Sequence, residues 1–119
     1  MPSVTVEIGN GSVLRAGNHD FSNTDKPFKE QGHTAKKVFS SDHREASIII
    51  EDDVWIASNC TILSGAKIGK GSIVSAGSVV AGKLPEYSIS VGNPARPIAS
   101  RKNISFSRKY YHFPPKELK

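Results

Sequence analysis

Four histidines and one cysteine are the residues of this chain whose chemistry suits a base or a nucleophile near neutral pH. His19, His33 and His43 fall in one polar stretch, whereas Cys60 lies in an apolar stretch with no histidine close to it in sequence. An imidazole can accept the proton of a hydroxyl group that attacks an acyl carbon. Spacing alone selects none of the histidines, because most histidines in polar loops are simply solvated. We expect Cys60 to be a packing residue.

The apolar stretch around Cys60 repeats with a period of six. A β-branched aliphatic residue recurs at positions 50, 56, 62, 68, 74 and 80. This period does not fit a helix of 3.6 residues per turn, but it fits strands whose side chains alternate. Because one strand cannot be so long, the chain must turn regularly. The sequence therefore predicts stacked coils of short strands, with the branched residues inward and small residues at the interior corners: Val54, Cys60, Ala66, Ser72 and Ser78.

The same phase extends to both sides of the repeat. Ile8 and Leu14 are six residues apart and are in phase with it. The polar stretch 19–47 has no sustained period and is expected to be a loop inserted in the coil domain, which spans 1–98. The repeat is expected to fade after Pro85, and NPARP indicates a turn and an extended exit. We expect the basic and aromatic tail, 99–119, to cover the last coil.

Composition limits the function classes. The chain has 119 residues, one cysteine, a formal charge of +5 and a pI of about 9.5, so an intrachain disulfide is excluded. The charge suits a polyanionic partner or cofactor, although a solvated basic surface is the simpler interpretation. No apolar run is long enough to span a membrane, and MPSVTVEIGNG lacks the features of a signal peptide. We therefore expect a cytoplasmic protein without a membrane partner.

Two stretches resemble a known family. IIIEDDVWIASNCTILSGAKIGKGSIVSAGSVVAGKLPEYSISVGNPARPI, residues 48–98, resembles the signature of the hexapeptide-repeat acyltransferases, in particular the galactoside, maltose and polysaccharide O-acetyltransferase branch. AGNHDFSNTDKPFKEQGHT, residues 16–34, is similar to the protruding loop of that branch. The resemblance implies an all-β fold, a left-handed parallel β-helix with triangular coils. It also implies a homotrimer that binds acetyl-CoA in the groove between neighbouring chains.

The resemblance also implies roles for single residues. His19 matches the catalytic histidine, a general base for transfer of an acetyl group to a sugar or polysaccharide hydroxyl. Asn18 and Trp55 match acceptor-binding positions, although Trp55 would equally suit packing between chains. The expected cofactor-binding residues are Ser58, Ala76, Ala81, Gly82 and Arg96. Ala81 and Gly82 replace a Thr-Lys pair of the family, with Lys83 displaced by one position, and Ala57 replaces a glycine.

Three other functions compete with this interpretation. A non-catalytic trimeric β-helix scaffold is favoured by the replaced lysine and by the small number of coils. A metal-dependent lyase of the gamma carbonic anhydrase type shares the fold, but the histidines lack the spacing of its zinc ligands, so no metal is expected. Nucleic-acid binding through SRKNISFSRKYYHF would use interleaved basic and aromatic residues, but no nucleic-acid fold accompanies them, and none is expected as a partner.

Overall fold

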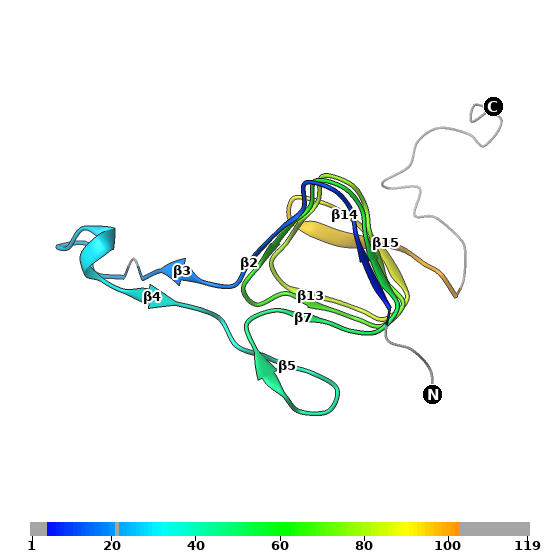
Figure 1. Cartoon of the computed structure of the whole chain (residues 1–119), viewed down its shortest axis with the longest axis horizontal. Coiled ribbons are helices and arrows are strands. Elements are labelled where there is room, and N and C mark those ends of the chain that lie inside the picture. The colour runs from blue at the N-terminus through cyan, green and yellow to red at the C-terminus, as the bar shows by residue number, and fades with distance from the viewer. Residues whose placement is uncertain (1–4, 21, 103–119) are drawn as a thin grey trace.

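The computed structural model describes residues 5–20 and 22–102 as a triangular coil of short strands from which a long loop extends (Figure 1). In this part of the chain no helix is long and apolar enough to cross a membrane. The elements are β1 (Val6–Ile8), β2 (Val13–Arg15), β3 (Asn18–His19), η1 (Phe28–Glu30), β4 (His33–Thr34), β5 (Val38–Phe39), β6 (Glu45–Ala46), β7 (Ile49–Ile50), β8 (Val54–Ile56), β9 (Thr61–Leu63), β10 (Lys67–Ile68), β11 (Ile73–Val74), β12 (Val79–Val80), β13 (Lys83–Leu84), β14 (Ser88–Gly92) and β15 (Ala95–Ser100).

The coil has three faces, each a sheet of parallel strands from successive turns, to which the first face adds one antiparallel strand, β15. The first face orders its strands β1-β8-β11-β14-β15, the second face contains β2, β9 and β12, and the third face contains β7, β10 and β13. The chain passes from the first face to the second and then to the third, and Figure 1 shows the three faces as the sides of a triangle. The predicted left-handed parallel β-helix is confirmed.

The interior contains the residues that the six-residue period selects. Ile56, Ile62, Ile68 and Val74 are fully buried and Val80 is 1% exposed, while Ile50 packs against this core from its edge. The predicted small corner residues are buried as well, including Cys60, which is a free thiol. Burying a branched side chain contributes roughly 1.5–3 kcal/mol relative to leaving it exposed, so this column is the main source of stability.

The first coil continues the phase of the repeat. Ile8 aligns with Ile56 and Leu14 with Ile62, as the sequence predicted. Both side chains are nevertheless almost half exposed, Ile8 at 46% and Leu14 at 45%, because only one neighbouring coil covers them. These inward-phase residues therefore form an apolar end of the coil.

The period ends earlier than expected. Val80 aligns with Ile62, eighteen residues before it, but Leu84 aligns with Ile68, only sixteen residues before it. The coil is therefore shortened at the corner 81–82, before Pro85, where the sequence analysis placed the end of the repeat. β15 then turns back and pairs antiparallel with β14, which ends the first face.

The inserted loop contains two antiparallel strand pairs. The segment 18–34, named the arm here, is formed by β3, η1 and β4, and the segment 38–46, named the hairpin, is formed by β5 and β6. Figure 1 shows the arm extending away from the corner between the second and third faces, with the hairpin below it. The loop predicted at 19–47 is confirmed. Residues 103–119 of the predicted capping tail lie outside the described residues.

Candidate active site

The arm and the coil meet at the corner between the second and third faces. There Asn18 donates a hydrogen bond from Nδ2 to Oγ of Ser64, at 3.1 Å, and Ser64 is only 3% exposed. The returning chain is bonded to the same corner, because the Gly65 N–H donates to the carbonyl of Ser47 at 2.6 Å. The start and the end of the inserted loop are thus both attached to one turn of the coil, which we name the loop root.

The backbone of His19 directly follows this attachment. β3 pairs with β4 so that Asn18 lies opposite Thr34 and His19 opposite His33. The Asp20 N–H donates to the carbonyl of Gly32 at 3.1 Å, which continues the pairing beyond β3. The backbone at position 19 therefore belongs to a strand pair that is fixed to the coil one residue earlier.

Two of the predicted cofactor-binding residues, Ala81 and Gly82, form the shortened corner above the loop root. The carbonyl of Gly82 accepts a hydrogen bond from the Lys67 N–H at 3.2 Å. A Cβ atom added at Gly82 would meet no atom within 4 Å, so the corner is open on that side. The open space fits the expectation that an extended ligand passes close to the backbone here.

The other predicted cofactor-binding residues lie elsewhere. Ser58 and Ala76 are exposed in the corner between the first and second faces, where the Gly77 N–H donates to the carbonyl of Ser58 at 3.0 Å. The three residues of β9 separate this corner from the loop root, roughly 10 Å at 3.3 Å per strand residue. Arg96 is exposed in β15 at the far end of the first face. One chain therefore does not bring this set together.

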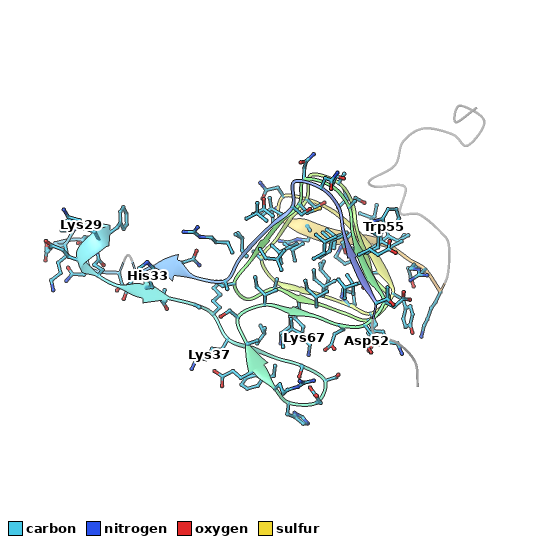
Figure 2. All side chains as sticks on the ribbon, viewed as in Figure 1. Lys29, His33, Lys37, Asp52, Trp55 and Lys67 are labelled. Atoms are coloured by element: carbon cyan, nitrogen blue, oxygen red, sulfur yellow. The ribbon has the colours of Figure 1, made fainter. Side chains whose placement is uncertain are left out.

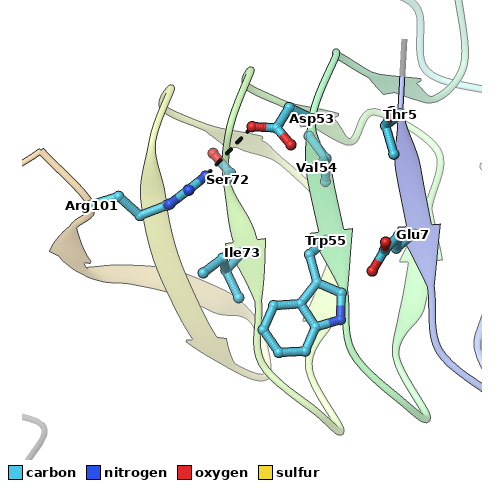
Figure 3. Close-up of a pocket in the computed structure, with 8 residues that line it drawn as sticks. All are labelled: Thr5, Glu7, Asp53, Val54, Trp55, Ser72, Ile73 and Arg101. Atoms are coloured by element: carbon cyan, nitrogen blue, oxygen red, sulfur yellow. Dashed lines mark ion pairs between the residues drawn. The ribbon is translucent and has the colours of Figure 1, made fainter. Parts of the chain in front are cut away.

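Trp55 points outward from the first face, as its position one residue before an inward isoleucine predicted. Its side chain is 51% exposed, and its strand neighbours are Glu7 in β1 and Ile73 in β11. A pocket of about 190 Å³ lies over these strands, lined by Thr5, Glu7, Asp53, Val54, Trp55, Ser72, Ile73 and Arg101. Figure 3 shows the indole between Glu7 and Ile73. An aromatic surface beside a carboxylate is suited to polar rings with an apolar face.

One wall of this pocket is an ion pair that joins distant segments. Asp53 adopts a φ of 56° in the turn before β8, and its carboxylate lies 3.8 Å from Nη1 of Arg101 (Figure 3). The same guanidinium donates to the carbonyl of Gly71 at 2.5 Å. Arg101 therefore fastens the end of β15 to two successive coils. The sequence did not predict this partner of Asp53.

Trp55 and the loop root lie on different sides of one chain. Figure 2 shows Trp55 on the first face, whereas His33 and Lys37 mark the loop on the opposite side of the triangle. The residues predicted to bind one acceptor, Asn18 and Trp55, therefore do not meet within the chain. Among the described residues, no group of three or more His, Cys, Asp or Glu side chains is placed to hold a metal ion.

Comparison with known proteins identifies the repeat. Residues 47–82 match the family model described as bacterial transferase hexapeptide (six repeats). This segment is a run of hexapeptide repeats. Its corners include Ser58, Ala76 and Ala81 of the predicted site, whereas Asn18 and His19 lie upstream of the match.

Several proteins similar to this chain are named as acetyltransferases. Over 52 residues the chain is 56% identical to a 2,3,4,5-tetrahydropyridine-2,6-dicarboxylate N-acetyltransferase of Clostridium perfringens, covering 44% of this chain and 22% of the relative. A Vibrio cholerae hexapeptide-repeat acetyltransferase, solved with acetyl-CoA, matches with a TM-score of 0.67 and 32% identity over 82% of this chain and 47% of that one. A galactoside acetyltransferase solved with coenzyme A matches with a TM-score of 0.62 and 27% identity over 92% and 48%.

The matches extend over only part of these relatives. The chain spans about a quarter of the curated relatives, 22–26%, and about half of the solved structures, 47–48%. The matched segment 47–82 is the hexapeptide coil. The matches to the two solved structures cover 82–92% of this chain and therefore also include residues outside this segment.

Several residues around the candidate site escaped the sequence analysis. Glu7 and Ile73 flank Trp55 because each precedes an inward residue by one position, as Trp55 does. Lys67 and Lys83 share this phase on the third face. Applying the six-residue period to outward positions as well as inward ones identifies Glu7, Lys67 and Ile73. Lys83 is out of this period, because the corner 81–82 is shortened by two residues. The ion pair between Arg101 and Asp53 cannot be found from the six-residue period, because it depends on the reversal of the chain before β15.

Proposed function

We propose that this chain forms an acetyl-CoA-dependent acetyltransferase site, with His19 as the general base and a sugar or polysaccharide hydroxyl as the acceptor. The observation that carries the proposal is the attachment of the Asn18–His19 strand to Ser64, inside the hexapeptide coil. The similarity to structures solved with acetyl-CoA and with coenzyme A supports the choice of acyl donor.

In the proposed acetyl transfer, the main contribution of a side chain is a general base. A hydroxyl group attacks a thioester slowly because its pKa is far above neutral, and an imidazole that accepts the proton in the transition state typically gains about 10²–10⁴-fold. In the proposed reaction the acceptor oxygen bonds to the acetyl carbon and the bond from that carbon to sulfur breaks. The coenzyme A thiolate then takes up the proton that His19 received. The negative charge on the carbonyl oxygen is met by a backbone N–H.

We infer that the site is completed by a homotrimer. Trp55, Ser58 and Ala76 lie away from the loop root of their own chain, whereas a three-fold arrangement can bring the loop root of one chain against the first face of the next. The exposed indole and its pocket then serve either the acceptor or the contact between chains. Sedimentation of the purified protein measures the trimer, and a monomer at the concentration used for assays would contradict it.

Replacing His19 with alanine tests the proposed base. We expect His19→Ala to keep the trimer and acetyl-CoA binding, both measured in one buffer by sedimentation and calorimetry, while turnover falls by about 10²–10⁴-fold. The matched control is His43→Asn in the hairpin, because asparagine tolerates the φ of 64° at that position. Turnover close to that of the unchanged protein in His19→Ala would reject the assignment. A trimer that binds no acetyl-CoA would favour the scaffold alternative.

An amine is the second candidate acceptor. The curated relative from Clostridium perfringens is named as an N-acetyltransferase, and a Bacillus cereus N-acyltransferase solved with dTDP and coenzyme A matches with a TM-score of 0.62 and 26% identity over 81% of this chain and 49% of that one. The same base would accept a proton from an amine. Assays with galactose and glucosamine as acceptors separate the two candidates, since mass spectrometry distinguishes an ester from an amide by its loss under mild alkali.

A further inference from the structure

Two lysines lie side by side on the third face, next to the loop root. Lys67 in β10 and Lys83 in β13 are direct partners in adjacent parallel strands, which places their backbones about 4.8 Å apart. Each precedes an inward residue, Ile68 or Leu84, so both lysines project outward (Lys67 is labelled in Figure 2). Like charges that face each other across two strands are destabilising. An anion bound by both ammonium groups would remove this repulsion.

Lys36 approaches the same corner from the inserted loop. Its aliphatic chain lies over Gly65, where an added Cβ atom would be 3.1 Å from Cδ of Lys36 and 3.4 Å from the carbonyl oxygen of Ala81. The Lys67 N–H in turn donates to the carbonyl of Gly82. Lys36 therefore lies against the corner that adjoins the Asn18–Ser64 hydrogen bond, and Lys67 and Lys83 begin the third face directly after it.

In the part of the chain that the structure describes, none of these three lysines takes part in an ion pair. Within residues 5–20 and 22–102 the ion pairs are Lys37–Glu45 at 3.0 Å, Arg44–Asp42 at 2.8 Å and Arg101–Asp53 at 3.8 Å. The acidic residues of the nearby hairpin are thus paired with Arg44 inside it and with Lys37 directly before it. Hydrogen bonds from Ser40 and Arg44 lower the pKa of Asp42 to about 2, so this carboxylate is fully ionised and fully engaged. The lysines are therefore left without an acidic partner among the described residues, although Glu51 lies beside the hairpin, where it accepts a hydrogen bond from the Ser41 N–H.

We propose that the acceptor carries an acidic group, a carboxylate or a phosphate, which Lys36, Lys67 and Lys83 bind while its hydroxyl or amine reaches His19. This inference rests on the proposed acetyltransferase function and names its substrate class. The acyl donor carries phosphates as well, but its pantetheine arm separates them from the reacting thioester. Lys36 lies against the corner to which the residue next to His19 is attached, Lys67 and Lys83 directly follow that corner, and this position favours the acceptor.

Binding of matched acidic and neutral sugars tests the proposal. Galacturonate and galactose form one pair, and glucosamine 6-phosphate and glucosamine form the other. Each is titrated by calorimetry into the protein saturated with coenzyme A, which cannot transfer an acetyl group. We expect the acidic member of at least one pair to bind about tenfold tighter or more, as a charge-assisted hydrogen bond allows. This preference should disappear in Lys67→Gln/Lys83→Gln and persist in Lys70→Gln, an exposed lysine of a different corner.

The donor is tested in parallel. Acetyl-CoA and acetyl-dephospho-CoA are titrated into the same variants, with circular dichroism and the melting temperature as checks on folding. We expect the affinity for acetyl-CoA to change less than threefold in Lys67→Gln/Lys83→Gln. A tenfold loss for acetyl-CoA that is absent for acetyl-dephospho-CoA would assign the lysines to the donor and overturn the proposal. Equal or absent binding of both acidic sugars would overturn it too. A failure of the proposed acetyltransferase function would give a different result, because the protein without substitutions would then not bind acetyl-CoA.

Discussion

The coil and the inserted loop are built by opposite means. In the coil, residues 48–92, the inward branched side chains from Ile56 to Val80 are buried to within a few per cent, and the strands pair with neighbours sixteen or eighteen residues away. In the arm the side chains are mostly exposed, and the backbone is held by short-range contacts. The Asn23 N–H donates to Oε1 of Gln31, for example, while Nε2 of Gln31 donates to the carbonyl of Lys26.

This difference explains where the candidate chemistry lies. The coil is rigid and regular, but its outward positions are mostly small or apolar, so it supplies few reactive groups. The loop is rich in polar side chains, but on its own it would hold them loosely. The loop root joins the two regions, because Asn18, Lys36 and Ser47 each contact one corner of the coil. The position of a base on the loop is therefore well defined only while these contacts at the loop root are intact.

The largest expected effect comes from the coil interior. Ile62→Ala should lower the free energy of unfolding by about 2–5 kcal/mol, because it removes a fully buried side chain and leaves a cavity. Urea denaturation followed by circular dichroism measures the change. Val79→Ala, on the same face but half-buried, is the matched control and should cost less than about 1 kcal/mol. Equal losses for the two variants would contradict the assignment of the interior column.

A second test compares two turns of the coil. Gly71 and Gly77 have nearly the same φ, 75° and 76°, but an added Cβ atom at Gly71 would lie 2.4 Å from the Tyr87 ring, whereas at Gly77 it would meet nothing within 4 Å. Gly77→Ala should therefore cost about 1–2 kcal/mol from backbone strain alone. Gly71→Ala should cost about 1–3 kcal/mol more, because Tyr87 must move. Melting curves of both variants would rule out this account if Gly77→Ala proved the more destabilising.

The coil could be predicted from the sequence because one period determines it. The inward residues, the small corners and the phase of Ile8 and Leu14 all follow from counting by six, and each was confirmed. The end of the period was predicted too late, at Pro85. The corner is shortened by two residues, so the next inward residue is Leu84, four positions after Val80. Both residues are apolar, and their types therefore do not reveal the change of register.

The candidate site was less predictable for a physical reason. Its members come from segments that no period relates, so their mutual distances depend on the path of the loop and of the neighbouring chain. Trp55 and Asn18 could be selected by resemblance, but their placement on different sides of one chain could not. The contacts of Lys36 with Gly65 and of Arg101 with Asp53 depend on chain reversals outside the repeat. The roles of His19 and the cofactor-binding residues stay predictions.

The hydrogen bond between Asn18 and Ser64 separates a positioning role from a binding role. Asn18→Ala and Ser64→Ala should each lower stability by about 1 kcal/mol, the usual value for one hydrogen bond. If Asn18 only positions the arm, both variants lower kcat to a similar extent and leave the KM for the acceptor unchanged. If Asn18 also binds the acceptor, only Asn18→Ala raises that KM. Steady-state kinetics of the two single variants and of the double variant measure the coupling.

The smallest expected effect lies in the hairpin, where a local contact should act without the coil. Asp42 accepts hydrogen bonds from Ser40 and from Arg44, and these lower its pKa from 3.8 to about 2. A lowered pKa in the folded state means that the ionised carboxylate stabilises the hairpin above pH 3.8 and that this contribution is lost as the pH falls through about 2. NMR titration of the Asp42 carboxyl carbon should therefore give a midpoint near 2.

Two substitutions test the causes of this pKa shift. Ser40→Ala and Arg44→Gln should each move the midpoint toward 3.8, because the Ser40 hydroxyl and the Arg44 guanidinium both lower the pKa of Asp42. Asp42 is exposed, so global unfolding should hardly change in either variant, and only the hairpin resonances should respond. If either variant instead shifted the resonances of the coil core, the hairpin would be coupled to the coil. The division of this molecule into a cooperative coil and a locally held loop would then have to be abandoned.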